Sequence, residues 1–528
     1  MKGYQWHVKE ADDNLGGSRD RGGVLVKKGT ESARRRNPIP EYPKVESWKL
    51  EGGNSSSADC CSWDGVNCDE ETGHVIKLDL SSSCLSGSIN STTTLFHLVH
   101  LQWLSLSYNF FNFSEIPSTI NNLSRLSHLN LSSSYISGQI PPQLLDLRNL
   151  VSLDLSRNYF FEAPGNQTHY LELRVPSLQN LVEKLTNLKV LKLDAVQISS
   201  PIPHILANLS SLTYLSLQDC GLRGEFPTKI FQLPNLSVLK LTDNSNLTGY
   251  LPEFERSSPL TVLAIGDCGF SGTIPSSLGN LTKLVSLDVS FSSFLGELPI
   301  SIGNLASLKE LNLEACNFSG QISSSLGNLT QLDYLDLSHS HNKFSGQNSA
   351  SLSWIAKNSK LNILLLSDLN LVVFMNNTVA NTNPQKFFSI GLRSCNLSNF
   401  PNFLRNQDLL QVLDLSSNSI TGKIPGWFLN DSVPNLRYLN LSHNLFTEFS
   451  QHPNVRPPYI ISLDVRYNKL EGPLPLILSK EMSEYLVSNN KLTGEIPQLI
   501  CKSKYLYALD LSNNNLSGVL PQCLANLK

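Results

Sequence analysis

Residues 506–521 read Leu506-Tyr-Ala-Leu-Asp-Leu-Ser-Asn-Asn-Asn-Leu-Ser-Gly-Val-Leu-Pro521. The stretch contains the frame L-x-x-L-x-L-x-x-N, followed by L-S/T-G-x-I/L-P. Clear copies of this frame recur at Leu153–Asn158, Leu239–Asn244, Leu413–Asn418 and Leu439–Asn444. The last frame position can be followed through 18 units from Ser83 to Asn514, and five consecutive steps between Val196 and Cys316 are each 24 residues long. One short unit therefore makes up most of the chain.

The physical chemistry of this unit predicts a leucine-rich-repeat solenoid. The leucines of L-x-L point to one side of an extended segment, because side chains alternate along a strand. One unit cannot bury its own leucines, but stacked units share a continuous apolar interior. We therefore expect an α/β repeat solenoid, wound as a right-handed superhelix. A parallel β-sheet should line its concave face, with 3-10 or irregular structure on the convex face.

The remaining frame positions have roles at the turns. An Asn side chain both donates and accepts hydrogen bonds, so it can satisfy backbone groups where the strand ends. The Gly of S/T-G-x-I-P permits a positive φ, and the following Pro should discourage helix on the outer side.

Two departures from the regular spacing divide the repeats. From Asn158 to Val196 there are 38 residues, which indicates an insertion at 159–186 whose second half, 178–188, reads as a short amphipathic helix. The interval from Asn342 to Cys395 takes 53 residues for two units, which predicts irregular loops at 343–388. The expected organisation is a disordered segment over 1–40, an N-terminal cap over 41–74 and about 18 repeats over 75–528.

The ten cysteines fall into groups by their place in the frame. Cys220, Cys268, Cys316 and Cys395 occupy the Asn position, where a buried thiol packs and acts as a weak donor, so we expect them to be inert. Cys501 and Cys523 lie on the outer side of consecutive turns, where a disulfide is plausible.

Three further cysteines precede the first repeat. Cys61 and Cys68 form the more plausible bridge of a stapled cap, which leaves Cys60 without an obvious partner unless Cys84 reaches it. Metal binding by Cys60, Cys61 and Cys68 is the rival reading, but no second C-x-x-C or His pair completes a tetrahedral site.

Composition excludes several functional classes. The chain has 41 Lys and Arg against 44 Asp and Glu, which gives a formal charge of −3. Such a balance lacks the excess of basic residues that is typical of nucleic-acid-binding proteins. No apolar run approaches the ~18 residues of a membrane span, and the first thirty residues lack a signal-peptide core. Hydrolase, P-loop, zinc-protease and kinase motifs are absent from the sequence. We therefore expect no enzyme activity, cofactor or metal.

The cap sequence carries a family resemblance. Residues Asp59–Cys68, followed by Thr72-Gly-His-Val-Ile-Lys-Leu-Asp-Leu80, resemble the N-terminal cap of plant leucine-rich-repeat receptor-like proteins. Ser137-Gly-Gln-Ile-Pro141 and the Cys501 and Cys523 pair match the same class. The resemblance implies an extracellular ectodomain on the plasma membrane, attached by a C-terminal helix. Such an ectodomain binds peptide, protein or microbe-derived ligands and signals through partner receptor kinases in defence or development.

This chain departs from that pattern at both ends, and we expect it to be truncated there. The signal peptide and first cap cysteine are missing before residue 41, and the closing cap and membrane helix are missing after Lys528. Two alternatives stay open: a secreted inhibitor of a pathogen cell-wall-degrading enzyme, and the ectodomain of a receptor kinase.

Sequons N-x-S/T fit an extracellular glycoprotein, although the repeat itself generates many of them. The candidate glycosylation sites are Asn54, Asn90, Asn112, Asn166, Asn246, Asn376 and Asn430.

Ligand contacts are expected at the outward x positions of x-L-x-L-x-x. Recurrent aspartates such as Asp154, Asp288 and Asp336 belong to the repeat template and are discounted. Residues that break the template are better candidates, because exposed aromatic and Arg side chains favour interface anchoring. They are Trp103, Tyr108, Arg157, Lys192, Tyr214, Gln218, Lys240, Phe291, Glu310, Glu314, Tyr334, His339, Arg393 and Tyr467. As a hypothesis, the units between Lys192 and Tyr334 contribute most of a peptide- or protein-binding strip.

Overall fold

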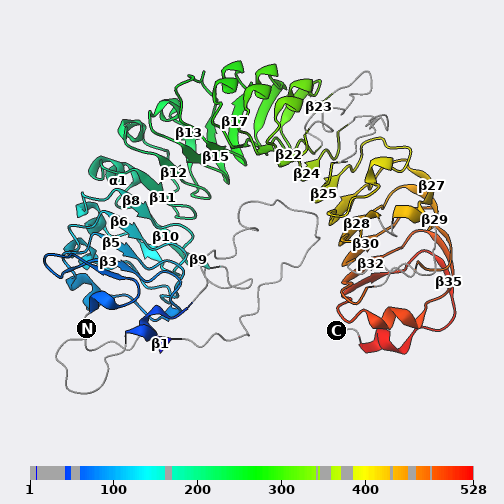
Figure 1. The fold of residues 1–528 in the computed structure, drawn as a ribbon, viewed down its shortest axis with the longest axis horizontal. Helices are drawn as coiled ribbons and strands as arrows, with labels where there is room; N and C mark the ends of the chain where they lie inside the picture. Colours follow the sequence, from blue (N-terminus) through cyan, green and yellow to red (C-terminus); the bar gives the residue numbers. More distant parts are fainter. Residues whose placement is uncertain are drawn as a thin grey trace. The chain divides into compact units, whose positions relative to one another are not determined.

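The computed structural model describes residues 7–8, 42–48, 60–160, 169–339, 343–344, 358–369, 385–428, 432–449, 460–475 and 479–526. The chain divides into two compact units, Met1–Gly249 (unit 1) and Tyr250–Lys528 (unit 2). In each unit, short parallel strands stack along one side of a coil and short helices lie on the opposite side (Figure 1).

The main sheet of unit 1 contains one parallel strand from each of its repeats. Neighbouring strands pair in register, so that Leu129 lies opposite Leu153 and Leu191 lies opposite Leu215. The strands are β3 (Val75–Asp79), β5 (Trp103–Ser105), β6 (His128–Asn130), β8 (Ser152–Asp154), β11 (Val190–Lys192), β12 (Tyr214–Ser216) and β14 (Val238–Lys240). Strand β2 (Val66–Cys68) pairs antiparallel with β3 and covers this end of the sheet.

The main sheet of unit 2 follows the same register over a longer run of repeats. Its strands are β16 (Val262–Ala264), β18 (Ser286–Asp288), β20 (Glu310–Asn312), β22 (Tyr334–Asp336), β24 (Ile363–Leu365), β25 (Ser389–Gly391), β26 (Val412–Asp414), β28 (Tyr438–Asn440), β30 (Ser462–Asp464), β32 (Glu484–Leu486) and β34 (Ala508–Asp510). The central side chains of these strands are almost all buried, as with Leu287, Leu311 and Leu335. Burial of one such leucine contributes about 1.5–3 kcal/mol, and the predicted leucine-rich-repeat solenoid is confirmed.

The Asn at the end of the frame joins each repeat to the preceding one. Asn158 donates from Nδ2 to the carbonyl oxygens of Leu131 and Leu155, and its Oδ1 accepts from the backbone N–H groups of Ser134 and Ile136. Its side chain therefore satisfies backbone groups in two turns, as the frame predicts, and adds an inter-repeat bond that the frame alone did not specify.

Cysteines at this position take over part of the same role. The thiols of Cys220, Cys316 and Cys395 each donate to a carbonyl oxygen of the preceding repeat at 3.1 Å. Burial raises the pKa of Cys316 and of Cys395 to about 12. A thiol with so high a pKa is a poor nucleophile, which agrees with the expectation of inert packing residues.

The residue just before the frame-end position is left-handed in every repeat, which the sequence did not predict. Its φ lies between 50° and 81°, whether it is Ser82, Tyr108, Phe291 or His339. Left-handed backbone is unfavourable for residues with a Cβ. The strain is offset by a ladder hydrogen bond to the next repeat, such as Phe291 N–H to the carbonyl oxygen of Glu314 at 2.8 Å.

A second set of short strands follows the frame in many repeats. In unit 1 these are β4 (Leu85–Ser86), β7 (Gly138–Gln139), β13 (Arg223–Glu225) and β15 (Asn244–Gly249). In unit 2 they are β17 (Cys268–Gly272), β19 (Ser293–Glu297), β21 (Asn317–Gly320), β23 (Lys343–Phe344), β27 (Thr421–Ile424), β29 (Leu445–Phe449), β31 (Glu471–Gly472), β33 (Lys491–Glu495) and β35 (Asn515–Ser517). The motif glycine in these strands has the expected positive φ, as at Gly272.

Short 3-10 helices follow the motif proline and cover the side opposite the main sheet. Pro275 and Pro299 each stand immediately before such a helix, so the proline precedes a short helix rather than discouraging one. A proline tolerates this place because its missing N–H would have no partner there. The helices are η4 (Thr94–His97), η5 (Ser118–Asn122), η6 (Pro142–Asp146), η7 (His204–Asn208), η8 (Thr228–Gln232), η9 (Ser276–Asn280), η10 (Ile300–Asn304), η11 (Ser324–Asn328), η13 (Asn402–Leu404), η15 (Gln498–Lys502) and η16 (Gln522–Asn526).

The insertion in unit 1 contains a strand pair and a helix. Strand β9 (Tyr159–Phe160) pairs antiparallel with β10 (His169–Glu172), which also pairs parallel with β7. The predicted helix is present as α1 (Leu178–Lys184) and begins with a capping box between Ser177 and Asn180. The strand pair was not predicted, and residues 161–168 lie outside the described part of the chain.

The N-terminal cap consists of η2 (Lys44–Ser47), η3 (Cys60–Ser62) and β2. Trp48 and Trp63 stack there with ring centroids 5.0 Å apart. Of the segment 1–40, which we expected to be disordered, the structure describes His7–Val8, a two-residue strand β1 that pairs antiparallel with β4.

The second irregular region needs one correction of register. In other repeats the frame ends five residues after the central leucine, as from Leu153 to Asn158, so Leu335 places it at residue 340 and not at Asn342. His339 has the left-handed φ of the residue before the frame end, which supports this count. Residues 340–342 and most of the predicted loops at 343–388 lie outside the described residues.

Candidate functional site

The solvent-facing side of the main sheet, here called the open face, presents four positions in each repeat. They are the first and third strand residues and the second and third residues after the strand. Template aspartates at the third strand residue are engaged locally: Asp154 and Asp288 each accept from the backbone N–H of the serine two residues later, at 3.1 and 3.0 Å. They fix the bend after the strand, which supports discounting them as ligand contacts.

Trp103 is the centre of an aromatic stack on the open face of unit 1. Its ring lies 4.2 Å from the ring of His128, and the Lys77 ammonium lies 5.0 Å from its centroid. The side chain is 36% exposed. The sequence analysis missed Lys77 and His128. Both residues pair in register with Trp103 across the neighbouring strands, and this shared position was the available signal.

Lys192 and Tyr214 form a second group on the same face. The Lys192 ammonium lies 3.5 Å from the Asp154 carboxylate and 4.8 Å from the centre of the Tyr214 ring. Gln218 donates from its backbone N–H to the carboxylate of Asp194, and burial raises the pKa of that carboxyl. Lys192 and Tyr214 therefore contact each other, whereas Gln218 donates to Asp194 and Thr242.

Three other predicted residues of unit 1 have different surroundings. Tyr108 and Arg157 lie at the left-handed bend after the strand, not on the strand itself. Lys240 is only 7% exposed, so the expectation of a solvent-facing lysine was wrong. Lys240 occupies an open-face position of its strand, but the burial of its side chain depends on how neighbouring residues pack around it. The spacing of residues in the sequence does not encode that packing.

In unit 2, Phe291, Glu314 and His339 come together from three successive repeats. The His339 Nδ1 lies 3.3 Å from a carboxylate oxygen of Glu314, which is buried, and its ring centroid lies 6.3 Å from that of Phe291. Phe291 and His339 both occupy the left-handed bend. An exposed aromatic side chain therefore stands beside the contact between His339 and Glu314.

Tyr334 adjoins this group and is surrounded by carboxylates. Its hydroxyl donates to Asp336 at 3.1 Å. Burial, together with the charges of Asp336, Glu314 and Asp288, raises the pKa of the Tyr334 hydroxyl. Burial also raises the pKa of Asp336, although hydrogen bonds from Ser338 and Tyr334 oppose that shift.

The remaining predicted contacts of unit 2 are separate from this group. Glu310 is exposed and accepts a hydrogen bond from the Ser286 hydroxyl at 3.0 Å. Arg393 lies 3.9 Å from Asp368. Tyr467 stacks on His443, which the sequence analysis missed, with ring centroids 4.3 Å apart.

One part of the open face of unit 2 is acidic. Within the described residues, the four open-face positions of the repeats of β16, β18, β20 and β22 contain no Lys or Arg. They contain five carboxylates: Asp267, Asp288, Glu310, Glu314 and Asp336. Lys309, which precedes β20, and His339 are the nearby basic residues.

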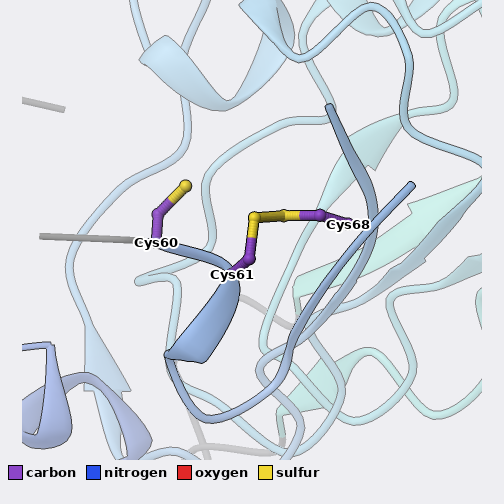
Figure 2. Close-up of side chains that lie close together, drawn as sticks. All are labelled: Cys60, Cys61 and Cys68. Carbon is purple, nitrogen blue, oxygen red and sulfur yellow. A yellow bond between two sulfur atoms is a disulfide. The ribbon is translucent and has the colours of Figure 1, made fainter. Parts of the chain in front are cut away.

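The cysteines at the cap form a disulfide. Cys61 and Cys68 are joined, with Cα atoms 5.5 Å apart, and Cys60 lies beside them (Figure 2). The three sulfurs lie within 4.8 Å of one another, but two of them are bonded to each other and offer no thiolate to a metal. Cys501 and Cys523 are joined between η15 and η16, the second pairing expected from the sequence.

Three candidate glycosylation sites lie on the described surface. Asn90, Asn112 and Asn246 are exposed, whereas Asn54, Asn166, Asn376 and Asn430 lie outside the described residues. In the part of the chain that the structure describes, no helix is long and apolar enough to span a lipid bilayer.

Comparison with known sequences places this architecture in a family. Residues 257–452 match the family described as "Leucine-rich repeat region", and residues 125–147 and 505–527 match "Leucine Rich Repeat". Receptor-like protein 7 of Arabidopsis thaliana is 38% identical over 568 residues, covering 89% of this chain and 58% of that protein. Receptor-like protein 49 of the same plant is 34% identical, covering 87% and 50%.

The chain is a leucine-rich-repeat protein that is similar over most of its length to plant receptor-like proteins. It spans about half the length of these relatives. The similarity extends to a second plant genus. Receptor-like protein Cf-9 of Solanum pimpinellifolium is 36% identical over a match that covers 40% of this chain and 23% of that protein.

Solved structures of plant receptors share the fold of this chain. The Arabidopsis receptor kinase HAESA, solved with the peptide hormone IDA and the co-receptor SERK1, has a TM-score of 0.64 at 28% identity, covering 92% of this chain and 85% of that chain. PEPR1, solved with AtPEP1, has a TM-score of 0.53 at 26% identity, covering 92% and 74%. The chain therefore has the architecture of a plant leucine-rich-repeat receptor ectodomain.

Proposed function

We propose that this chain is the ligand-recognition part of a non-enzymatic cell-surface receptor, which binds an extended peptide or a protein segment on the open face of the main sheet. The observation that carries the proposal is the set of solvent-facing aromatic side chains held there by rigid backbone. Trp103 stacks on His128, the Lys192 ammonium lies over the Tyr214 ring, and Phe291 stands at a left-handed bend. Aromatic groups that are ordered before binding lose little entropy on contact, so they favour interface anchoring.

The acidic section of unit 2 adds a preference to this proposal. With the template aspartates discounted and Glu314 buried, Asp267 and Glu310 remain accessible in four repeats without an open-face Lys or Arg, and they favour a ligand with basic side chains at that section. The complexes of HAESA and PEPR1 with peptides support the general class of ligand.

Signalling in this proposal belongs to partners. A receptor-like protein on the extracellular face of the plasma membrane would bind its ligand and recruit a membrane-bound receptor kinase, in defence or development. The similarity to Cf-9 fits defence, and the presence of the co-receptor SERK1 in the HAESA complex fits a kinase partner.

A peptide selection tests the binding surface. A phage-displayed random dodecapeptide library is selected on the purified chain, and recovered peptides are titrated by fluorescence anisotropy. Replacing Phe291 and Tyr334 of unit 2 together by Ala should weaken binding at least tenfold, the equivalent of about 1.4 kcal/mol. Replacing the exposed Tyr250 and Tyr505, which lie off the open-face positions, should leave it unchanged. Equal binding by both variants would contradict the proposal.

A further inference from the structure

A tight turn in unit 1 presents Asn112 to solvent. The backbone N–H of Ser114 donates to the carbonyl oxygen of Phe111 at 3.0 Å, and φ is 48° at Asn112 and 57° at Phe113. Positive φ at both central residues defines a type I′ turn, which usually contains Asn-Gly. A phenylalanine at the second position is unfavourable and is stabilised here by its N–H bond to the carbonyl oxygen of Tyr135, at 2.7 Å.

The turn is held rigidly, while the side chain of Asn112 is not. The Ser114 hydroxyl donates to the carbonyl oxygen of Phe111 at 2.7 Å and accepts from the Ile89 N–H at 3.1 Å. Asn112 is exposed, and its side-chain amide makes no hydrogen bond with any residue that the structure describes. Asn112-Phe113-Ser114 is a sequon for N-linked glycosylation.

An aromatic cluster with one exposed member stands beside this asparagine in the sequence. The Phe110 patch consists of Phe110, Phe113 and Tyr135, whose ring centroids lie 5.0 to 6.1 Å apart, and Phe113 also stacks on His169 at 4.4 Å. Phe110 is 37% exposed and stands two residues before Asn112.

We propose that Asn112 carries an N-linked glycan whose first N-acetylglucosamine lies on the Phe110 patch. The sugar donor in this modification is a lipid-linked oligosaccharide diphosphate. The amide nitrogen of Asn112 forms a bond to C1 of the first sugar and loses one proton, and the lipid diphosphate leaves from the same carbon. The C–H side of the sugar ring is apolar and slightly positive, and the face of an aromatic ring is negative, so the two surfaces attract. Attachment two residues away supplies a high effective concentration.

The test is a double-mutant cycle on glycosylated protein. The chain is secreted from a eukaryotic host behind a heterologous leader, and occupancy of Asn112 is read by glycopeptide mass spectrometry. The variants Asn112→Gln, Phe110→Ala and their combination are compared by thermal unfolding. Asn112→Gln should lower Tm by about 2 °C in the wild-type background, and by clearly less in the Phe110→Ala background. Because the cost of Gln in the turn is the same in both backgrounds, the difference isolates the contact between sugar and ring.

Enzymatic trimming and a second sequon provide the controls. An endoglycosidase that leaves one N-acetylglucosamine should preserve Tm, whereas an amidase that removes the whole glycan should lower it. Asn246 is the asparagine of a second exposed sequon, but the residue two positions before it is the buried Asn244 and not an aromatic residue. The effect on Tm of Asn246→Gln should therefore be independent of Phe110→Ala. An unmodified Asn112, or additive effects of Asn112→Gln and Phe110→Ala, would overturn the proposal.

Discussion

Asn158 donates a hydrogen bond from its buried side chain to the carbonyl oxygen of Leu131 in the preceding repeat, at 2.8 Å. The same side chain contacts three further backbone groups, which belong to Leu155, Ser134 and Ile136. Four backbone groups in two turns therefore depend on one amide. Equivalent residues such as Asn244 and Asn418 repeat the arrangement.

Removal of this amide should be strongly destabilising. Asn158→Ala leaves buried backbone groups without partners, each at about 1–3 kcal/mol, and should lower the free energy of unfolding by about 3 kcal/mol. Urea unfolding followed by circular dichroism measures the change. Asn158→Cys should cost less, because a thiol still donates at the equivalent Cys220. The matched control is Asn149→Ala, where an exposed asparagine donates to Ser124. Equal losses in the Asn158→Ala and Asn149→Ala variants would contradict the bridging role.

Asp336 should make stability depend on pH. Burial raises the pKa of its carboxyl in the folded state, so its contribution to stability is full below the ordinary value of 3.8 and declines as pH rises through the folded pKa. Asp336→Asn should therefore raise Tm at pH 7, and the gain should shrink as pH approaches 3.8. Thermal unfolding at several pH values measures this.

Asp510, at the same strand position, predicts the opposite sign. Burial acts to raise its pKa, but hydrogen bonds from Ser488 and Ser512 outweigh burial and lower it. Its stabilising contribution is present above 3.8 and is lost as pH falls through the lowered pKa. Asp510→Asn should lower Tm at pH 7. A gain in Tm for both variants would show that the shifts are misassigned.

Glu310 should contribute to binding of basic peptides. A fluorescein-labelled hexa-arginine peptide serves as the probe, and Glu310→Gln should raise its dissociation constant about twofold to fivefold, the range expected for an exposed ion pair. The matched control is Glu484→Gln, since Glu484 occupies the same strand position and accepts from the Ser462 hydroxyl as Glu310 accepts from Ser286. Equal weakening by the two substitutions would place the effect outside the acidic section.

The regular part of the fold could be predicted because each leucine and each asparagine has the same task in every repeat. The left-handed residue before the frame end could not be predicted, because Tyr108, Phe291 and His339 share no intrinsic preference for positive φ and adopt it through bonds to the next repeat. The β9–β10 pair escaped detection because it lacks the repeat pattern. On the open face, outward positions were recognisable, but the burial of Lys240 and the stacking of Trp103 on His128 depend on contacts between repeats.

Site-specific photo-crosslinking tests the proposed binding face most directly. p-Benzoylphenylalanine is placed at Phe291, at Tyr334 or at Tyr250, and each protein is irradiated with a peptide recovered from the dodecapeptide selection. Open-face binding predicts crosslinked peptide at positions 291 and 334 and none at 250. Crosslinking at position 250 alone would contradict it.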